Sequence, residues 1–306
     1  MRFPHFCVLG STIAPEKRFI AGSFAINVGI LVRLASRWVA GIHMDDALLR
    51  TRRVNKDGIG AIINILGEHY EDEKSVEETV VEYIQLIEKI KEDGLDAGVS
   101  IKLSQFGLMI NEEYCRKNVE RILAKVMEYN GFLWIDMEDS RFTDATIRIY
   151  EMCLERYPMV GLAVQTNLKR TEADVRRLVK KGGRIRLCKG AYRENPAISY
   201  PKRRDTTVNY SRILRVLFEE GDNFAVGTHD MDMINESLEL HKTHNRTFEF
   251  QMLQGVRETT AIELARKGYR VVEYVPYGPR WLAYFSRRLK ERPGNVITMF
   301  RSLVSG

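Results

Sequence analysis

The chain has 306 residues, a formal net charge of +6 and an isoelectric point near 9.0. This length suits one large α/β barrel as well as two smaller domains. The charge is only mildly basic, and few aromatic residues accompany the clearest basic run, Lys202-Arg203-Arg204. The composition therefore argues against a nucleic-acid-binding protein, and we expect no nucleic acid as a partner.

The cysteines and histidines predict neither disulfide bonds nor a metal site. No C-x-x-C pair occurs among the four cysteines, Cys7, Cys115, Cys153 and Cys188. We expect reduced, mostly buried thiols in a cytoplasmic protein. His241 and His244 are three residues apart on a predicted helix, but no third ligand accompanies them, so we predict no metal.

The N-terminal segment is predicted to be helical. Phe19–Val32 is largely apolar and lies between Arg18 and Arg33. It is shorter than the about 20 residues that cross a bilayer. The helical pattern continues through Trp38, which argues against a signal peptide. We expect residues 1–57 to pack on the main domain; contact of this helix with a membrane surface is the alternative.

From about residue 58 onward, short apolar runs alternate with amphipathic helical patterns. The predicted strands are Ala61-Leu66, Ala97-Leu103, Phe132-Met137, Val160-Thr166, Arg184-Lys189, Asn223-Thr228, Thr247-Met252 and Arg270-Val275. The predicted helices between them are Val76-Lys91, Glu112-Tyr129, Thr143-Arg156, Glu172-Lys181, Val208-Glu219, Asp232-Lys242 and Glu258-Arg266. Eight such units without a linker predict a (β/α)8 barrel over residues 58–306.

A doubly wound open sheet is the competing architecture. It normally carries a glycine-rich phosphate turn directly after its first strand. The nearest match, Gly58-Ile59-Gly60, precedes the strand and lacks the third glycine. This mismatch favours the barrel.

In a (β/α)8 barrel, functional residues gather at the carboxyl ends of the strands. The polar residues at the predicted strand ends are Glu68, Lys102, Gln105, Asp136, Glu138, Asp139, Gln165, Asn167, Lys189, Tyr192, Thr228-His229-Asp230, Gln251, Gln254, Tyr274 and Tyr277. Capping of helix N-termini explains Asn111 and Asp230. It does not explain lysines, glutamines and tyrosines, so we predict an active site at this end.

The segment Tyr274–Glu291 predicts a pocket for a small anion. It reads as an apolar run, a turn at residues 276–279 and a helix. Counted from Tyr284, Arg287 and Arg288 follow by three and four residues and Glu291 by seven, so the four share one helix face. Two guanidinium groups on one face suit a carboxylate. A solvated basic face is the alternative, but it leaves the aromatic residues of this segment unexplained: Tyr274, Tyr277, Trp281 and Tyr284.

Seven motifs stand at these strand ends and on the last predicted helix. They are ILGE at 65–68, SIKLSQFGL at 100–108, WIDMEDS at 134–140, RLCKGAY at 186–192, GTHD at 227–230, EFQMLQGV at 249–256 and YVPYGPRWLAYFSRRLKERPGN at 274–295. In this order they resemble the proline dehydrogenase family of FAD-dependent (β/α)8 flavoproteins. The similarity is greatest to the monofunctional bacterial and archaeal type.

The resemblance implies oxidation of L-proline to Δ1-pyrroline-5-carboxylate, with hydride passing to flavin N5. Lys102, Arg287 and Arg288 would hold the proline carboxylate, and Asp136 would support them. The wall around the pyrrolidine ring would consist of Ala191, Tyr192, Leu253, Tyr274 and Tyr284. The catalytic set is therefore expected to be Lys102, Asp136, Tyr274, Arg287 and Arg288.

The resemblance also implies non-covalently bound FAD. Arg186 would lie at the edge of the isoalloxazine ring, where a cation stabilises the negative charge of the reduced flavin. The further cofactor contacts would be Gln165, Lys189, Gly190, Thr228, His229 and Glu291. Glu68 would pair with Arg186 as a gate over the site.

Three residues depart from the family pattern. Cys188 stands where valine is common, Arg193 where many bifunctional relatives carry tryptophan, and Asn64 where some relatives carry aspartate. The tryptophan position leaves one flavin edge without an assigned contact. We expect no aldehyde dehydrogenase domain in this chain.

The implied partners are L-proline, a quinone that accepts the electrons, and a separate pyrroline-5-carboxylate dehydrogenase. We expect a cytoplasmic protein with a peripheral contact at the inner face of the cell membrane. Two alternatives remain: a related flavin barrel that acts on another cyclic imino acid or a folate, and a catalytically inactive anion-binding barrel.

Overall fold

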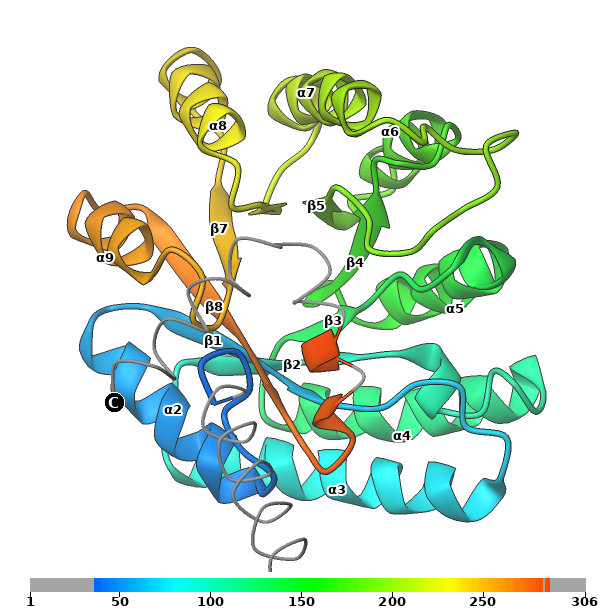
Figure 1. Ribbon diagram of the computed structural model, residues 1–306. Coiled ribbons are helices and arrows are strands. Elements are labelled where there is room, and N and C mark those ends of the chain that lie inside the picture. Colours follow the sequence, from blue (N-terminus) through cyan, green and yellow to red (C-terminus); the bar gives the residue numbers. More distant parts are fainter. Residues whose placement is uncertain (1–35, 283, 287–306) are drawn as a thin grey trace, which may run out of the picture.

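Eight parallel strands form a closed barrel at the centre of the molecule (Figure 1). The computed structural model describes residues 36–282 and 284–286. The strands pair in chain order, and β1 also pairs with β8, which closes the sheet. They are β1 (Gly60–Ile65), β2 (Ala97–Ile101), β3 (Leu133–Ile135), β4 (Val160–Gln165), β5 (Arg184–Cys188), β6 (Phe224–Gly227), β7 (Phe248–Leu253) and β8 (Arg270–Tyr277). All eight lie within two residues of their predicted ends, and the predicted (β/α)8 barrel is confirmed.

Helices surround the barrel and alternate with its strands. They are α2 (Met44–Lys56), α3 (Glu73–Glu92), α4 (Glu112–Glu128), α5 (Thr143–Arg156), α6 (Thr171–Val179), α7 (Arg203–Glu220), α8 (Met231–His244) and α9 (Glu258–Arg266), with 3-10 turns at Leu103–Gln105 and Ser140–Phe142. Residues 281–282 and 284–286 are also helical. Within the described ranges, no helix combines the length and the apolar character of a membrane span.

Side-chain capping marks the starts of α3, α4 and α8. Asp72, Asn111 and Asp230 each accept a hydrogen bond from a backbone N–H in the first turn of the following helix. The capping predicted for Asn111 and Asp230 is confirmed, and such a cap contributes about 1 kcal/mol. The largest difference from the predicted helix boundaries is at α7, which begins at Arg203 rather than Val208. Its first turn is charged and exposed, so an apolar periodicity cannot reveal it.

Apolar residues fill both sides of the barrel wall. Outside it, strand and helix residues form the main core. Inside it, a separate cluster of Ile62, Trp134, Ala225 and Val272 closes the interior. Parallel strands that are buried on both faces read as nearly continuous apolar runs, which is why their positions could be predicted.

Helix α2 packs against β1 and β8 and fills the gap between α9 and α3 in the helical ring (Figure 1). Arg50 of α2 donates two hydrogen bonds, of 2.7 and 2.6 Å, to the carboxylate of Glu273 on β8, which is only 8% exposed. The predicted division between residues 1–57 and 58–306 falls between α2 and β1. The described part of residues 1–57 packs on the barrel, so the structure marks no separation between the two segments. The predicted division therefore stays a prediction.

Strand β8 continues through Pro276 to Tyr277, where the sequence predicted a turn. The carbonyl of Pro276 accepts a hydrogen bond of 2.9 Å from the N–H of Ala40. In a strand residue, the N–H and the C=O point to the same side. The side on which Pro276 lacks an N–H therefore faces the region beyond Leu253, where β7 has already ended. The missing N–H costs no hydrogen bond of the sheet. Side-chain alternation then turns Tyr277 outward, where its hydroxyl donates to Glu82 of α3 at 2.9 Å. The prediction that Tyr277 walls the anion pocket is wrong.

Candidate active site

A cavity of about 1160 Å³ lies at the carboxyl ends of the strands. It exceeds the roughly 300–1,000 Å³ of sites for drug-sized ligands, so it can hold more than one small acid. It is lined by every described residue that the sequence assigned to substrate or cofactor: Lys102, Asp136, Gln165, Arg186, Lys189, Gly190, Ala191, Tyr192, Thr228, His229, Leu253, Tyr274 and Tyr284. The predicted site residues Arg287, Arg288 and Glu291 lie outside the described residues.

The carboxylate of Asp136, just after β3, is the centre of a buried hydrogen-bond network. Its Oδ1 accepts from Ser100 Oγ at 2.7 Å and from Arg186 Nη2. Its Oδ2 accepts from Tyr274 at 2.7 Å and from Lys102 Nζ at 3.1 Å. Strands β2, β5 and β8 therefore supply donors to one carboxylate, which fixes their side chains relative to one another.

The network holds these groups in defined protonation states. Burial alone would raise the pKa of Asp136, but Lys102 and Arg186 more than offset it and hold that pKa well below the usual value. Burial alone would lower the pKa of Lys102, yet Asp136 raises it above its usual value. Burial, and then the charge of Asp136, raise the pKa of Tyr274. Two cations, one anion and a protonated phenol leave a net charge of +1, which favours an anionic ligand.

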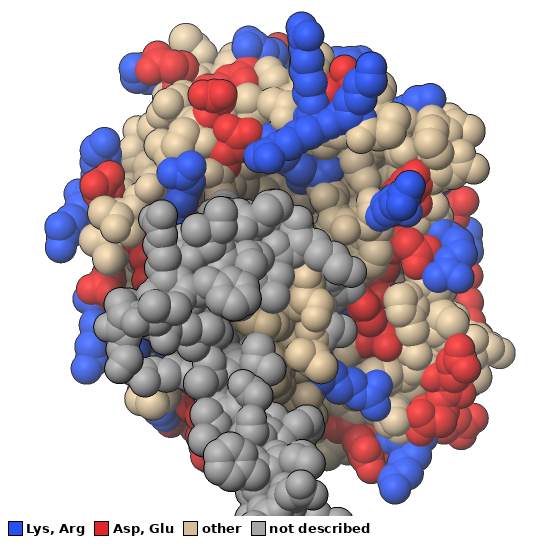
Figure 2. Space-filling model, viewed as in Figure 1, with Lys and Arg blue, Asp and Glu red and all other residues tan. Residues whose placement is uncertain are grey.

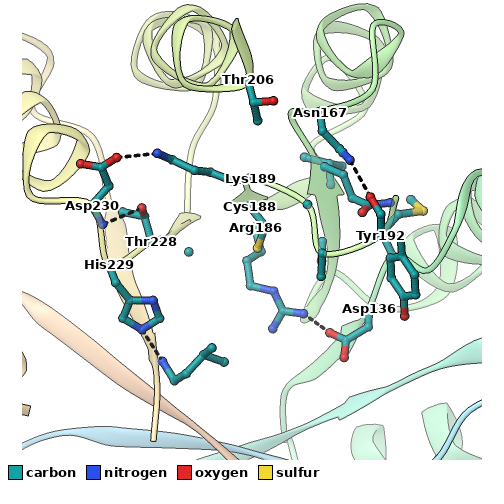
Figure 3. A pocket seen from close by; sticks show the side chains of 18 of the residues that line it. Asp136, Asn167, Arg186, Cys188, Lys189, Tyr192, Thr206, Thr228, His229 and Asp230 are labelled. Carbon is teal, nitrogen blue, oxygen red and sulfur yellow. Dashed lines mark hydrogen bonds and ion pairs between the residues drawn. The ribbon is translucent and has the colours of Figure 1, made fainter. Parts of the chain in front are cut away.

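Arg186 on β5 is fixed by aromatic rings as well as by hydrogen bonds. Its guanidinium carbon lies 5.0 Å from the centre of the Trp134 ring and 5.6 Å from that of Tyr274. Nη1 donates to Gln251 Oε1 at 3.2 Å. Burial alone would lower the pKa of Arg186, but Asp136 raises it. The guanidinium therefore stays charged, and Figure 3 shows it directed toward Asp136.

Glu68 does not contact Arg186, whose hydrogen-bond partners in the described part of the chain are Asp136, Gln251 and Ser100. Glu68 stands on the loop after β1 and lies outside the cavity lining. Its Oε2 is 3.4 Å from the hydroxyl of Tyr192. The predicted gate pair is thus not brought together here, and it stays a prediction.

The ends of β5, β6 and β7 build the other side of the cavity (Figure 3). Lys189 forms an ion pair with Asp230 at 2.5 Å and donates to Thr207 at 2.9 Å. His229 Nε2 accepts a hydrogen bond of 2.8 Å from the N–H of Leu253, which places that wall residue. Because Nε2 is the acceptor, the proton of a neutral His229 is on Nδ1.

Positive charge borders the cavity next to Lys189. Arg203 lines the cavity, and Lys202, Arg203 and Arg204 are all exposed where α7 begins. Figure 2 shows lysine and arginine side chains gathered on the part of this face where Figure 1 places α7. Guanidinium and ammonium groups in this position suit a phosphate-bearing ligand.

Three residues of the site were given no individual role from the sequence, although Gln251 was expected among the polar residues at the strand ends. Ser100 and Gln251 are members of the network, and Asn64 accepts a hydrogen bond of 3.3 Å from Lys102. The spacing along the strands could have revealed two of them. Ser100 precedes Lys102 by two residues, and Gln251 precedes Leu253 by two residues, so the members of each pair lie on the same face of a strand. Trp281 was expected in the pocket wall, but it packs on Phe285 at 5.8 Å between ring centres.

The geometry favours binding of a small carboxylate beside a larger anionic group. Among the residues that the structure describes, no group of three or more histidine, cysteine, aspartate or glutamate side chains is arranged to hold a metal ion. Lys102, Arg186, Tyr274 and Asp136 are the charged and hydrogen-bonding groups that meet in this part of the cavity.

Comparison with known proteins decides the family. A family model described as proline dehydrogenase matches residues 47–299. The chain belongs to the proline dehydrogenase family. Proline dehydrogenase 1 of Bacillus subtilis strain 168 is 35% identical over 273 residues, covering 88% of this chain and 90% of the relative. The proline dehydrogenase of Deinococcus radiodurans is 35% identical over 281 residues, covering 89% and 91%. These relatives confirm the resemblance to the monofunctional bacterial type of proline dehydrogenase.

Solved structures share the barrel. Proline utilization A of Bdellovibrio bacteriovorus, inactivated by N-propargylglycine, matches with a TM-score of 0.81 at 23% identity. The match covers 90% of this chain and 34% of that one. Proline utilization A of Corynebacterium freiburgense matches with a TM-score of 0.73 at 19% identity, covering 95% and 34%. This member of the proline dehydrogenase family thus spans about a third of the length of those proteins, and the likeness supports its fold.

Proposed function

We propose that the protein oxidises L-proline to Δ1-pyrroline-5-carboxylate with non-covalently bound FAD, as the first step of proline breakdown. The observation that carries the proposal is the buried contact of Lys102, Tyr274 and Arg186 with one carboxylate, Asp136, inside a cavity of about 1160 Å³. This arrangement suits a small amino acid, and the remaining volume suits a cofactor.

The donor set of the cavity fits a flavin nucleotide. Two buried oxygens that belong to cavity-lining residues, Gln165 Oε1 and Asn167 Oδ1, have no hydrogen-bond partner in the described part of the chain. Buried acceptors are normally paired, so N–H and hydroxyl donors of a bound group would complete them. The cations Lys189 and Arg203 suit the pyrophosphate. When bound, FAD supplies an acceptor for the hydride that leaves the ring carbon of proline. The proposed contacts are Gln165, Arg186, Lys189, Gly190, Thr228, His229 and Glu291.

The substrate carboxylate is held by cations. Lys102 is described by the structure, and Arg287 and Arg288 are assigned from the sequence. Such a clamp fixes the reacting carbon in one orientation, which replaces a search among many orientations. The proposed wall around the pyrrolidine ring consists of Ala191, Tyr192, Leu253, Tyr274 and Tyr284, all of which line the cavity.

Asp136 is assigned a positioning role. Its lowered pKa makes it a weak base at neutral pH, and four donors already occupy its oxygens. The amine of proline must be neutral when hydride leaves. The positive clamp lowers the pKa of that amine, so a proton can be released to solvent before the transfer.

Glu68 is proposed as a gate together with Arg186. Glu68 already borders Tyr192, a member of the proposed wall, at 3.4 Å. For the gate to close, the loop after β1 must bring this carboxylate to the guanidinium, which now contacts Asp136 and Gln251.

The proposed electron acceptor is a quinone, and the product passes to a separate pyrroline-5-carboxylate dehydrogenase. These steps place the protein in the cytoplasm with a peripheral contact at the inner face of the membrane. We assign that contact to the apolar segment within residues 1–57, which precedes α2.

Anaerobic addition of L-proline to the purified protein tests the central proposal. Bleaching of bound flavin absorbance is the expected result, and it reports cofactor, substrate and reaction together. A protein without flavin absorbance would instead support an anion-binding barrel. Faster bleaching by another cyclic imino acid or a folate than by L-proline would support the related flavin enzyme.

Substitution of Arg288 by methionine tests the clamp. The KM for L-proline should rise at least tenfold while FAD remains bound, because a charge-assisted hydrogen bond to a carboxylate is lost. An unchanged KM would remove Arg288 from the clamp.

A further inference from the structure

A polar chain runs along the barrel interior below the carboxylate network. Gln251 on β7 connects it, because its Oε1 accepts from Arg186 at 3.2 Å and its Nε2 donates to Glu249 Oε1 at 2.5 Å. Glu249 and Gln251 are two residues apart on β7 and therefore share the inward face. The chain thus extends from Glu249 through Gln251 and Arg186 to Asp136.

Glu249 decides which way the Gln251 amide points. An amide has one accepting and one donating end, an ionised carboxylate only accepts, and a guanidinium only donates. With Glu249 ionised, Nε2 of Gln251 must face Glu249, so Oε1 must face Arg186. Without an acceptor at residue 249, the amide could rotate and present its NH2 group to the guanidinium, which would be repulsive.

When it is ionised, Glu249 adds a second negative charge to this interior. Lys102, Arg186 and Asp136 sum to +1, and an ionised Glu249 brings the four groups to neutrality. The Glu249 side chain is 22% exposed, and its Oε2 lies 4.0 Å from Arg270 Nε. Burial raises the pKa of Glu249 above its usual value, and Gln251, Arg270, Arg184 and Arg186 offset this only in part.

We propose that Glu249 is a positioning residue for the redox reaction: through Gln251 it fixes the orientation of Arg186 and balances its charge beside the flavin. The inference rests on the proposed function, which places Arg186 at the flavin edge. It assigns a role to a residue that touches neither substrate nor cofactor.

Two substitutions separate the effect of Glu249 on the orientation of Arg186 from its effect on charge. Glu249→Gln keeps an acceptor for Gln251 Nε2 and removes the charge. Glu249→Leu removes both. Glu263→Gln is the matched control, because Glu263 on α9 is exposed and the change in net charge is the same.

The readouts are the flavin midpoint potential, measured spectroscopically in the holoprotein, and the steady-state constants for L-proline. Glu249→Gln should favour the reduced flavin about tenfold over Glu263→Gln, which corresponds to about 30 mV for a two-electron couple. Glu249→Leu should in addition lower kcat at least tenfold with little change in KM, because Arg186 lies outside the carboxylate clamp. A merely structural role would alter stability and leave the potential of Glu249→Gln unchanged.

The possible failures can be told apart. A wild-type protein that binds no flavin, or whose flavin L-proline does not reduce, contradicts the proposed function, and this inference falls with it. If L-proline reduces the wild-type flavin normally and the flavin midpoint potentials of Glu249→Gln and Glu263→Gln are equal, only the charge role of Glu249 is overturned. If Glu249→Leu folds and keeps the wild-type kcat, the orienting role is overturned; if it does not fold, the potential of Glu249→Gln still decides the inference.

Discussion

Tyr274 on β8 donates a hydrogen bond of 2.7 Å to Oδ2 of Asp136, which follows β3, across the interior of the barrel. The same oxygen accepts from Lys102, and the ring of Tyr274 lies against the guanidinium of Arg186. One side chain therefore helps to position both cations of the site. Substitution can distinguish the contribution of its hydroxyl from that of its ring.

Tyr274→Phe should lower kcat/KM for L-proline about tenfold to a hundredfold, because a hydrogen bond to a charged group contributes about 1.5–3 kcal/mol. The ring, and with it the contact to Arg186, is retained. Steady-state kinetics of the purified variant provide the measurement. Tyr277→Phe is the matched control, since it removes a buried hydroxyl that donates to Glu82 outside the cavity. Equal losses in the two variants would show that the effect is one of stability and not of the site.

Asp136→Asn should lower the free energy of unfolding by about 3–5 kcal/mol, the usual result when one partner of a buried ion pair is removed. Lys102 and Arg186 would remain buried with their compensating charge gone. Denaturant unfolding measures the loss. Asp144→Asn serves for comparison, because its ion pair with Arg170 is 68% and 43% exposed and contributes at most about 1 kcal/mol. A loss below 1 kcal/mol for Asp136→Asn would contradict the network as described.

The same carboxylate predicts a dependence of stability on pH. Its pKa is lowered in the folded protein relative to about 3.9 in the unfolded chain, so the unfolded state binds more protons between these values and stability rises with pH there. The contribution is complete above about pH 5 and is lost progressively as the pH falls through the unfolded-state pKa and then the folded-state pKa. Wild type should therefore lose more stability than Asp136→Asn between about pH 5 and pH 3. Parallel curves of melting temperature against pH would argue against it.

The convergence of Lys102, Asp136 and Arg186 could be predicted from the sequence. All parallel strands of a barrel end at the same face, so residues at strand ends become neighbours whatever their distance along the chain. The long apolar runs marked the strands, and the charged residues after them stood out. The barrel and the location of the site therefore required no pairwise information.

The partners within the site were harder to predict. Tyr277 was expected in the pocket because Pro276 reads as a strand terminator, but β8 continues through that proline and alternation turns Tyr277 to Glu82. Glu68 and Arg186 were paired by resemblance; in this structure the guanidinium contacts Asp136, and the gate pair stays a prediction. Such contacts depend on rotamers and on the relative height of neighbouring strands, which a single sequence does not record.

Gly190 provides a test of the cofactor side of the cavity. Its φ of 102° is a conformation that glycine adopts readily, and a Cβ there would lie 2.3 Å from Asn167 Oδ1. Asn167 cannot move away freely, because its Nδ2 donates to the carbonyl of Tyr192 at 3.2 Å. Gly190→Ala should therefore displace Asn167 and lower the flavin content of the purified protein by at least half, measured as the ratio of flavin to protein absorbance.

Gly182→Ala is the control. Gly182 has a φ of 76°, and no atom lies within 4 Å of the added Cβ. Only backbone strain of about 1–2 kcal/mol is expected, and the flavin content should be unchanged. If both variants lose flavin equally, backbone strain and not the shape of the cavity explains the result.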